Sequence, residues 1–353
     1  MDRETKHRQK KLGEKLFRRK STSKTWREHK LKTAEKREKA LLTANEEVKQ
    51  LKSGAPEQLH RKEGNRYSIS FAIPGSFLNN AQSAELRTYM TGQIARAATL
   101  FCVDDVIVYD ETCRMKKENV DAYWSGRWKG EIIPSDSNFE ACFYLARILE
   151  YIECPQYLRK YLFPFQKPLK YAGLLNPLDA HHHLRSDDTS IPFREGVVLD
   201  KPTKAGRGPL CDIGLEKSTL IELELEDVIQ LPAGTRVTVE VTNFGTDSKR
   251  YRGRLSSARK VREQCGKYWG YTVKLATSLK DVIDSKILLV FGGVSGVDAA
   301  LEAEETLRES CAEEAFDCLI NSLPYKGTNS ERVEENVFVT LAEFTMRLQQ
   351  LCS

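Results

Sequence analysis

The sequence predicts an α/β domain that is interrupted by a small all-β barrel. A strand–helix–strand pattern spans residues 67–109, and several short strands follow one another between residues 195 and 275. The strand and helix pattern then returns after Lys286. Because α/β stretches lie on both sides of the all-β stretch, we expect the barrel to be inserted into the α/β domain.

The first α/β stretch predicts a parallel sheet. Tyr67–Ile73 alternates between apolar and polar residues and is rich in aromatic and β-branched side chains, which is typical of a strand. A helical pattern follows over Ala84–Phe101, and Val106–Tyr109 predicts the second strand. The helix is long enough for a right-handed crossover, so we expect the two strands to be parallel.

The C-terminal stretch predicts a binding site at strand ends. Ile287–Phe291 is an unbroken apolar run, which indicates a buried strand, and Gly292, Gly293 and Gly296 follow it. The pattern then predicts a helix from Asp298 to about Ala312, a short strand over Phe316–Ile320 and a closing helix over Glu331–Leu348. Glycine-rich loops after strands favour a ligand site there. The alternative is that these glycines only make turns.

The all-β stretch from Glu195 to about Leu275 contains five to six short strands, the last of them YWGYTVKLA, separated by turn signals such as Pro232-Ala233-Gly234. This number of strands predicts an OB-like barrel. Its late segment is basic, with Arg252, Arg254, Arg259, Lys260 and Arg262. These cations could bind RNA or form a solvated barrel rim.

Charge is distributed unevenly along the 353 residues. Residues 1–53 hold 18 Lys and Arg against 8 Asp and Glu, a net charge of +10, which leaves −5 for the rest because the whole chain carries +5. This segment is too polar to bury a core by itself and predicts a basic, helical arm over residues 1–62 that contacts RNA. A solvated tail without a specific partner is the alternative.

Other features of the composition place the protein inside the cell. The nine cysteines form no CxxC pair, which indicates reduced thiols. No apolar run of about 18 residues is present, so we expect no membrane span, and the N-terminus lacks a secretory signal. We therefore expect an intracellular protein of the nucleus, the cytoplasm or both.

Two further motifs allow more than one interpretation. His181, His182 and His183 invite a metal site, but adjacent side chains point in different directions, so a local turn or an RNA contact is favoured and no metal is expected. Tyr157–Phe165 combines basic and aromatic residues, and could contact RNA or be a docked short helix.

Three stretches together resemble one known family. They are FAIPGSFLNN to TGQIARAATLFCVDDVIVYDE, YAGLLNPLDAHHHLR with the barrel after it, and ILLVFGGVSGVD to LINSLPYKGTNSERVEENV. The chain resembles SPOUT-class RNA methyltransferases over residues 66–348, and more closely the archaeal and eukaryotic family with an OB-like insertion. By this resemblance, residues 63–188 and 267–353 form the SPOUT domain, and residues 189–266 form the inserted barrel.

The resemblance implies a trefoil knot, a homodimer and S-adenosylmethionine as the methyl donor. The cofactor would be held through backbone atoms of Phe291, Gly292, Gly293, Asn321, Leu323, Pro324, Gly327, Thr328 and Asn336. Arg96 matches a G-x-I-x-R-like motif and would orient the RNA or polarise its base, and Glu331 and Arg332 are the candidates for proton handling. The acidic start of a helix is the alternative explanation for Glu331.

The sequence also departs from the family. Leu279–Ser285 is too short for the further strand and loop that relatives place there, so either one strand is missing or Tyr271–Leu275 replaces it. A missing strand would favour a second hypothesis, a catalytically decayed protein that binds RNA or serves as a scaffold at the spindle or kinetochore, with which some animal relatives are connected. A dinucleotide enzyme is a weaker third hypothesis, because G-x-G-x-x-G is absent.

Overall fold

A computed structural model of the chain describes residues 68–128, 137–201, 208–215, 220–224, 231–242, 244, 251–282, 288–307 and 311–352. The basic arm predicted over residues 1–62 lies outside these residues, as does the short link at residues 283–285. Among the helices that are described, none combines the length and the apolar character that a membrane crossing requires.

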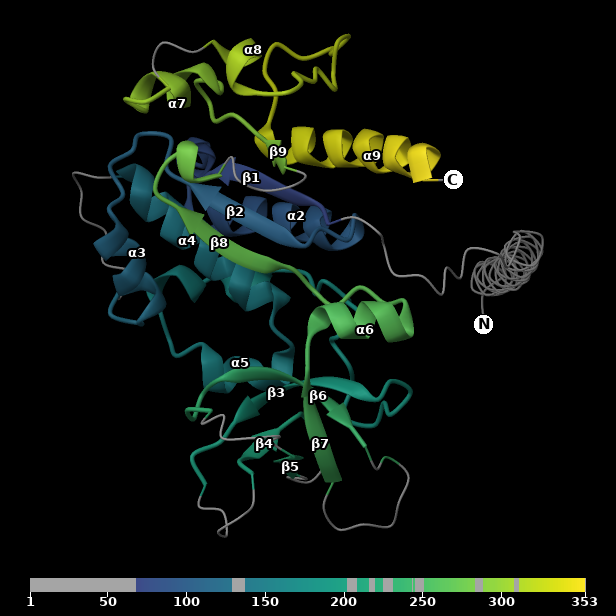
Figure 1. The fold of residues 1–353 in the computed structure, drawn as a ribbon. Coiled ribbons are helices and arrows are strands. Elements are labelled where there is room, and N and C mark those ends of the chain that lie inside the picture. Colours follow the sequence, from purple (N-terminus) through teal and green to yellow (C-terminus); the bar gives the residue numbers. More distant parts are fainter. Residues whose placement is uncertain are drawn as a thin grey trace, which may run out of the picture. The chain divides into compact units, whose positions relative to one another are not determined.

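The α/β domain is built on a four-stranded sheet in the order β8-β2-β1-β9 (Figure 1). Its strands are β1 (Ser70–Pro74), β2 (Asp105–Tyr109), β8 (Thr272–Ala276) and β9 (Leu288–Val290). All three pairings are parallel, so the carboxyl ends of the four strands meet at one edge. The expectation of a parallel sheet is confirmed.

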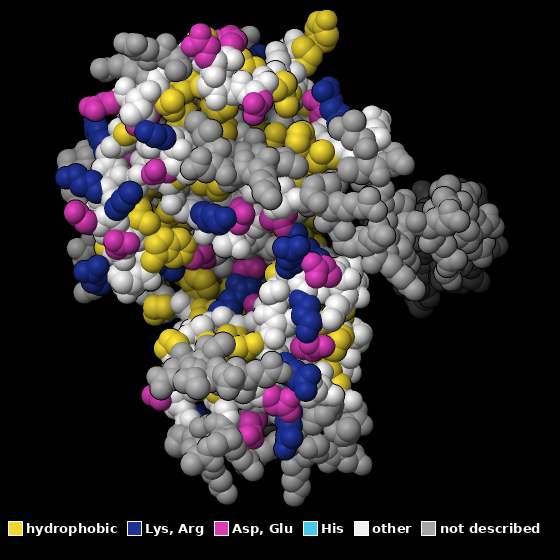
Figure 2. All heavy atoms as spheres, in the orientation of Figure 1, with side chains coloured by type: hydrophobic (Ala, Val, Ile, Leu, Met, Phe, Trp, Pro, Cys, Tyr) yellow, Lys and Arg dark blue, Asp and Glu magenta, His cyan; other side chains and the backbone are white. Residues whose placement is uncertain are grey.

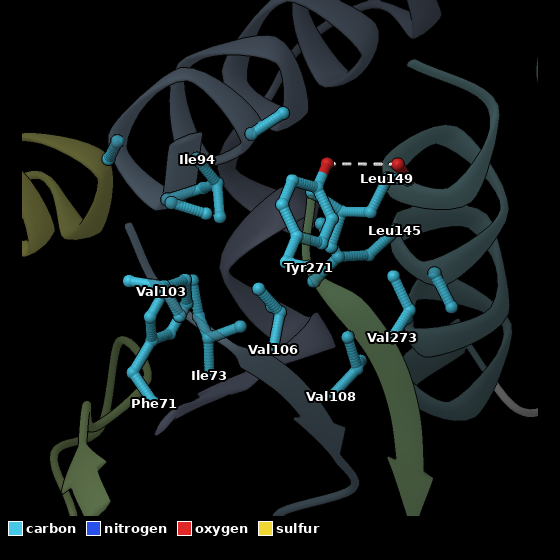
Figure 3. Packing of buried hydrophobic residues seen from close by; sticks show 14 of the residues in the cluster. Phe71, Ile73, Ile94, Val103, Val106, Val108, Leu145, Leu149, Tyr271 and Val273 are labelled. Atoms are coloured by element: carbon cyan, nitrogen blue, oxygen red, sulfur yellow. Dashed lines mark hydrogen bonds between the residues drawn. The ribbon is translucent and has the colours of Figure 1, made fainter. Parts of the chain in front are cut away.

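Alternation along β1 and β2 gives the sheet two apolar faces. Phe71, Ile73, Val106 and Val108 point into the larger core, where Figure 3 shows them opposite helix side chains such as Ile94. The intervening residues, such as Ala72, belong to a smaller cluster on the opposite face. A strand buried on both faces is typical of a parallel sheet, which explains why all five residues of β1 are buried.

Long helices cover the larger core. These helices are α2 (Ala84–Leu100), α4 (Ser137–Glu153) and α9 (Val333–Cys352), and α2 contacts the other two. Helix α2 begins after Ser83, whose side chain accepts a hydrogen bond from the backbone N–H of Leu86. The other helical elements in the described ranges are short: η2 (Gly75–Asn80), α3 (Lys117–Trp124), α5 (Gln156–Leu162), η3 (Lys167–Leu169), η4 (Ala172–Leu174), α6 (Ala258–Cys265), η6 (Lys280–Val282), α7 (Asp298–Ala303) and α8 (Ala312–Ala315).

The predicted barrel is present between α5 and α6. Five strands close in the order β3-β4-β5-β7-β6. They are β3 (Phe193–Val198), β4 (Leu210–Asp212), β5 (Leu220–Glu224), β6 (Arg236–Val241) and β7 (Tyr251–Ser256). Buried and partly exposed residues alternate along β5 and β6, so one side of each strand fills the barrel interior.

The stretch YWGYTVKLA is a correction to the predicted barrel. Its residues Thr272–Ala276 form β8 of the parallel sheet, paired with β2. Val273 packs in the larger core, and the Tyr271 hydroxyl donates to the backbone oxygen of Leu149 on α4 (Figure 3). Of the two alternatives for the short link, Tyr271–Leu275 therefore supplies a sheet strand.

Two predictions for the C-terminal stretch are wrong. The helix expected from Asp298 to about Ala312 ends at Ala303, because the backbone of Glu304 adopts an extended conformation. Phe316–Ile320 is not a strand but an irregular segment. The closing helix begins at Val333, so Glu331 and Arg332 precede it.

A buried ion-pair network joins the barrel to helix α4. The Arg236 guanidinium on β6 donates to both carboxylate oxygens of Glu153, at 2.6 and 3.0 Å, and its Nε donates to Glu195 at 2.7 Å. Thr238 Oγ1 and Trp269 Nε1 donate to the other oxygen of Glu195, at 2.7 and 2.8 Å. Both carboxylates are therefore fully paired although they are buried.

The histidine run completes this junction. His182 is fully buried, and its Nε2 lies 3.0 Å from Glu153 Oε1, while His183 Nε2 lies 2.6 Å from the Glu153 backbone oxygen. A direct RNA contact by His182 is thus excluded by its burial, and the local-turn interpretation is confirmed. Burial would raise the pKa of Glu153, but Arg236 and His182 together lower it.

Candidate functional site

A cavity of about 420 Å³ lies at the carboxyl end of β9. Its wall includes Leu289–Gly292 from the strand end, residues 315–320 from the irregular segment, and Asn336, Thr340 and Phe344 from α9. The volume falls within the range of about 300–1,000 Å³ that small-molecule sites occupy. The site therefore has the position that the parallel sheet predicts for it.

Hydrogen bonds fix the strand end that forms one wall. The Phe291 N–H donates to the backbone oxygen of Ala72 on β1, and the Phe291 oxygen accepts from the Tyr109 hydroxyl, both at 2.9 Å. Because both backbone groups of Phe291 already have these partners, the end of β9 is held beside β1 and β2. The ring itself meets Phe71 edge-on at 5.9 Å.

The next two positions are glycines with close neighbours, which are backbone atoms at Gly292 and side-chain ends at Gly293. A Cβ on Gly292 would lie 2.7 Å from the backbone nitrogen of Val297. A Cβ on Gly293 would lie 2.2 Å from Glu111 Oε2 and 3.0 Å from Ser76 Oγ. The turn that follows, from Gly293 to Gly296, is closed by a hydrogen bond from the Gly296 N–H to the Gly293 oxygen at 3.1 Å.

Three of the residues predicted to hold a cofactor come together in the cavity wall, namely Phe291, Gly292 and Asn336. Gly293 is next to the wall and faces Glu111. The other five predicted residues are not in the described lining and lie in the largely exposed loop after Ile320: Asn321, Leu323, Pro324, Gly327 and Thr328. Ser322 ties this loop to α9 through a 2.8 Å hydrogen bond with Thr340.

The three predicted catalytic residues lie outside the described cavity lining. Arg96 is exposed on α2, where its Nη1 donates to the backbone oxygen of Leu178 at 2.6 Å. Glu331 pairs with Lys326 at 2.5 Å, and the Arg332 carbonyl accepts the N–H groups that begin α9. A ligand or RNA would have to bridge these positions, so their catalytic roles stay predictions.

Sequence reasoning missed two polar side chains at the same sheet edge, Ser76 after β1 and Glu111 after β2. Burial raises the pKa of Glu111, Ser76 opposes this rise, and the charge of Asp110 adds to it. The Ser76 hydroxyl lies close by, yet neither Ser76 Oγ nor Glu111 Oε2 forms a hydrogen bond of good geometry within the described chain. Their position directly after parallel strands was the signal that could have identified them.

Asp110 shows the contrasting, structural use of a carboxylate. Its two oxygens accept hydrogen bonds from the backbone N–H groups of Thr112, Arg114 and Met115, at 2.8–3.0 Å, and from the Thr112 hydroxyl. Asp110 thus organises the loop after β2, whereas Glu111 keeps an oxygen without such a partner.

The described residues offer little for metal or disulfide chemistry. No group of three or more His, Cys, Asp or Glu side chains in the described ranges could hold a metal ion. The eight cysteines whose side chains are described are free thiols, as the scattered spacing predicts.

The fold and the cavity define a class of protein that has a cavity at the carboxyl edge of a parallel sheet and carries an inserted barrel. The comparison with protein families identifies this class. A family model described as "Putative RNA methyltransferase" matches residues 68–287 and 284–344. The chain belongs to this RNA methyltransferase family, which confirms the predicted activity class.

Individual relatives agree with this assignment. The chain is 51% identical over 355 residues to "Putative methyltransferase spot-1" of Caenorhabditis elegans, with 92% of each chain covered. It is 39% identical over 327 residues to the human "28S rRNA (uridine-N(3))-methyltransferase", covering 84% of this chain and 83% of the relative. The mouse protein of the same name is 40% identical over 321 residues, covering 82% and 79%.

Proposed function

We propose that the protein transfers a methyl group from S-adenosylmethionine to N3 of a uridine in large-subunit ribosomal RNA. The observation that carries this proposal is the cavity beside Gly292, at the carboxyl edge of the sheet, in a chain of an RNA methyltransferase family. The substrate is inferred from relatives at about 40% identity whose names specify that reaction.

The residues of the cavity fit S-adenosylmethionine. Phe291, Val297 and Phe316 supply apolar wall for an adenine ring, while Asn336 and Thr340 supply hydrogen-bonding groups. Gly292 also lines the cavity, and its lack of a side chain lets the backbone pass close to Gly296 and Val297. Asp317 in the wall adds a carboxylate, which suits the positive charge of a sulfonium.

Methyl transfer leaves two tasks to the protein. The cofactor, when bound, supplies a methyl group that is already activated as part of a sulfonium. The chain must align the uridine for in-line attack and accept the proton that leaves N3. We assign alignment to Arg96, and proton acceptance to Glu331 or to Glu111, whose raised pKa brings it closer to neutral pH than an ordinary carboxylate.

Finer features of the SPOUT resemblance belong to the same proposal. We propose that the chain is a homodimer, that the C-terminal part of the α/β domain forms a trefoil knot, and that the domain limits are 63–188 with 267–353 and 189–266. RNA contacts by the basic arm over residues 1–62 remain a prediction, since the arm lies outside the described residues.

The test combines binding with mapping of the product. We expect calorimetry to detect S-adenosylmethionine binding, and purified protein to methylate ribosomal RNA from cells that lack it at one uridine N3. Absence of cofactor binding at millimolar concentration would exclude the enzyme and favour the scaffold hypothesis. Transfer to an atom other than uridine N3 would keep the enzyme but reject the substrate.

A further inference from the structure

Three side chains in the second half of α5 and just after it are exposed. They are the cations Lys160 and Lys167 and the aromatic ring of Phe165. The Phe165 side chain is 91% exposed, and within the described chain it has no aromatic or cationic partner. A fully exposed phenyl ring lacks the stabilisation that burial of its apolar surface would supply. Its exposure therefore indicates that a binding partner covers it. We call these three residues, with Tyr161, the α5 surface.

The base beneath the α5 surface is rigid. Leu158 on the inner side of α5 is fully buried, and the Tyr157 hydroxyl donates to the backbone oxygen of Glu195 on the barrel at 2.7 Å. Arg159 donates to the backbone oxygen of Cys154 at 3.0 Å and lies over the Tyr151 ring at 4.5 Å. Folding therefore uses the inner side chains and leaves the outer ones presented on a fixed support.

The cations of the α5 surface differ from those of β7 and α6. Arg254 pairs with Glu224 at 3.2 Å, Arg259 with Glu263 at 2.9 Å, and Lys260 with Glu240 at 2.7 Å. Figure 2 accordingly shows dark blue and magenta side chains next to one another along the face that carries α6.

In contrast, Lys160 and Lys167 form no ion pair within the described chain, and Lys160 Nζ lies 4.5 Å from the centre of the Tyr161 ring. An unpaired lysine can replace the counterions of a phosphate without first giving up an acidic partner. The α5 surface is therefore better suited to a polyanion than the basic segment of β7 and α6.

The chain also connects this surface to Arg96. After η3 and η4 it runs along α2, where a Cβ on Gly92 would lie 2.7 Å from Leu175 Cδ2, and where the Leu178 oxygen accepts from Arg96. A strand of RNA bound at Phe165 and continuing along this segment would reach Arg96.

We propose that the α5 surface binds an unpaired segment of the RNA substrate, with a base stacked on Phe165 and phosphates at Lys160 and Lys167. The proposal rests on the proposed function for the nature of the substrate. An unpaired strand is required because an exposed ring can stack only on bases that are not stacked in a helix, and such stacking tolerates any base. The same ring would gain nothing from duplex RNA.

The test measures RNA affinity of the full chain by fluorescence anisotropy, with an unpaired oligonucleotide and a perfectly paired hairpin of equal length. We expect Phe165→Ala to weaken binding of the unpaired RNA about tenfold, within the range for one stacked base, and to leave the hairpin unaffected. The double variant Lys160→Ala/Lys167→Ala should lower the slope of log affinity against log salt by about 1.4, for two single-strand phosphates.

Arg254→Ala/Arg259→Ala is the matched control, because it removes the same charge from paired cations, and it should change affinity less than twofold. Equal binding of unpaired RNA by Phe165→Ala and wild type would overturn the proposal, as would an equal loss on the hairpin. If wild type transfers methyl groups while Phe165→Ala binds normally, only this inference fails. If wild type neither binds RNA nor transfers methyl groups, the proposed function fails with it.

Discussion

At the junction between barrel and sheet, Glu153 and Glu195 share Arg236, whereas at the carboxyl edge of the sheet Glu111 lies beside Asp110 without a cation among the described residues. The pKa of Glu153 at the junction is lowered, whereas the pKa of Glu111 at the edge is raised. Burial acts to raise the pKa in both regions, but at the junction Arg236 and His182 outweigh it.

This difference separates structural from functional use of charge. A buried carboxylate whose partners are all supplied by the fold stabilises one arrangement and has nothing left to offer a ligand. Glu111 and Ser76, with oxygens that lack a well-formed hydrogen bond, keep capacity for a ligand at the cost of stability. The contrast therefore agrees with the proposed site at the carboxyl edge of the sheet.

The largest expected effect is at the junction. Arg236→Met leaves Glu153 and Glu195 buried without their cation, so we expect the free energy of unfolding to fall by about 3–5 kcal/mol, measured by urea denaturation. Arg254→Met, at an exposed ion pair with Glu224, is the control and should cost less than about 1 kcal/mol. Similar losses of stability for both variants would show that the buried pairing at the junction contributes no more than an exposed ion pair.

The glycine turn should be next in size. In Gly292→Ala the new Cβ meets the backbone of Val297 and Gly296, which cannot move aside as a flexible side chain can. We expect a loss of about 1–3 kcal/mol of stability and at least tenfold weaker S-adenosylmethionine binding by calorimetry. Gly173→Ala, where a Cβ has open space, should bind the cofactor like wild type. Unchanged binding by Gly292→Ala would argue against the cavity as the cofactor site.

The pH dependence of stability should have opposite signs at the two regions. The pKa of Glu111 is raised above its ordinary 4.5, so the folded protein holds a proton that the unfolded chain has lost, and stability falls as pH rises above 4.5. Glu111→Gln abolishes this fall and should be the more stable protein at neutral pH, with the difference disappearing as pH falls to 4.5.

Glu153 behaves in the reverse sense, because its lowered pKa supplies stability that is present above 4.5 and is lost as pH falls below it. Melting temperatures recorded across this range for wild type and Glu111→Gln would check both signs. A Glu111→Gln variant that is less stable at neutral pH would show that the carboxylate has a partner in solution.

The smallest effect is expected where the loop after Ile320 meets α9. Thr340→Val removes the hydrogen bond to Ser322 while it keeps the shape of the side chain, so we expect a loss of about 0.5–1.5 kcal/mol in urea denaturation. Ser322→Ala removes the same hydrogen bond from the other side, and a double variant that loses no more than either single one would confirm the pairing.

The cavity was only partly predictable from the sequence. Gly292 could be identified because glycine after an apolar run indicates a turn at a strand end, and Asn336 came from the family resemblance. Thr340 and Phe344 could not be identified, because they face the cavity only once α9 packs beside β9. Glu111 was overlooked because the residue that it faces, Gly293, is distant in the chain and adjacent only in the folded structure.

The sequence by itself determined β1, α2 and β2. Apolar residues recur about every two residues in a strand and about every 3.6 residues in a helix, and this spacing is a local property of the chain. It also determined the presence of an inserted barrel, since alternation and turn residues recur along that stretch. Only the tertiary structure decided that Thr272–Ala276 joins the sheet, because the same alternation suits a barrel strand and a sheet strand equally well. Only it decided which charges are paired, since Glu153 and Arg236 meet through the docking of barrel and helix, and pairing across such a distance leaves no trace in local sequence.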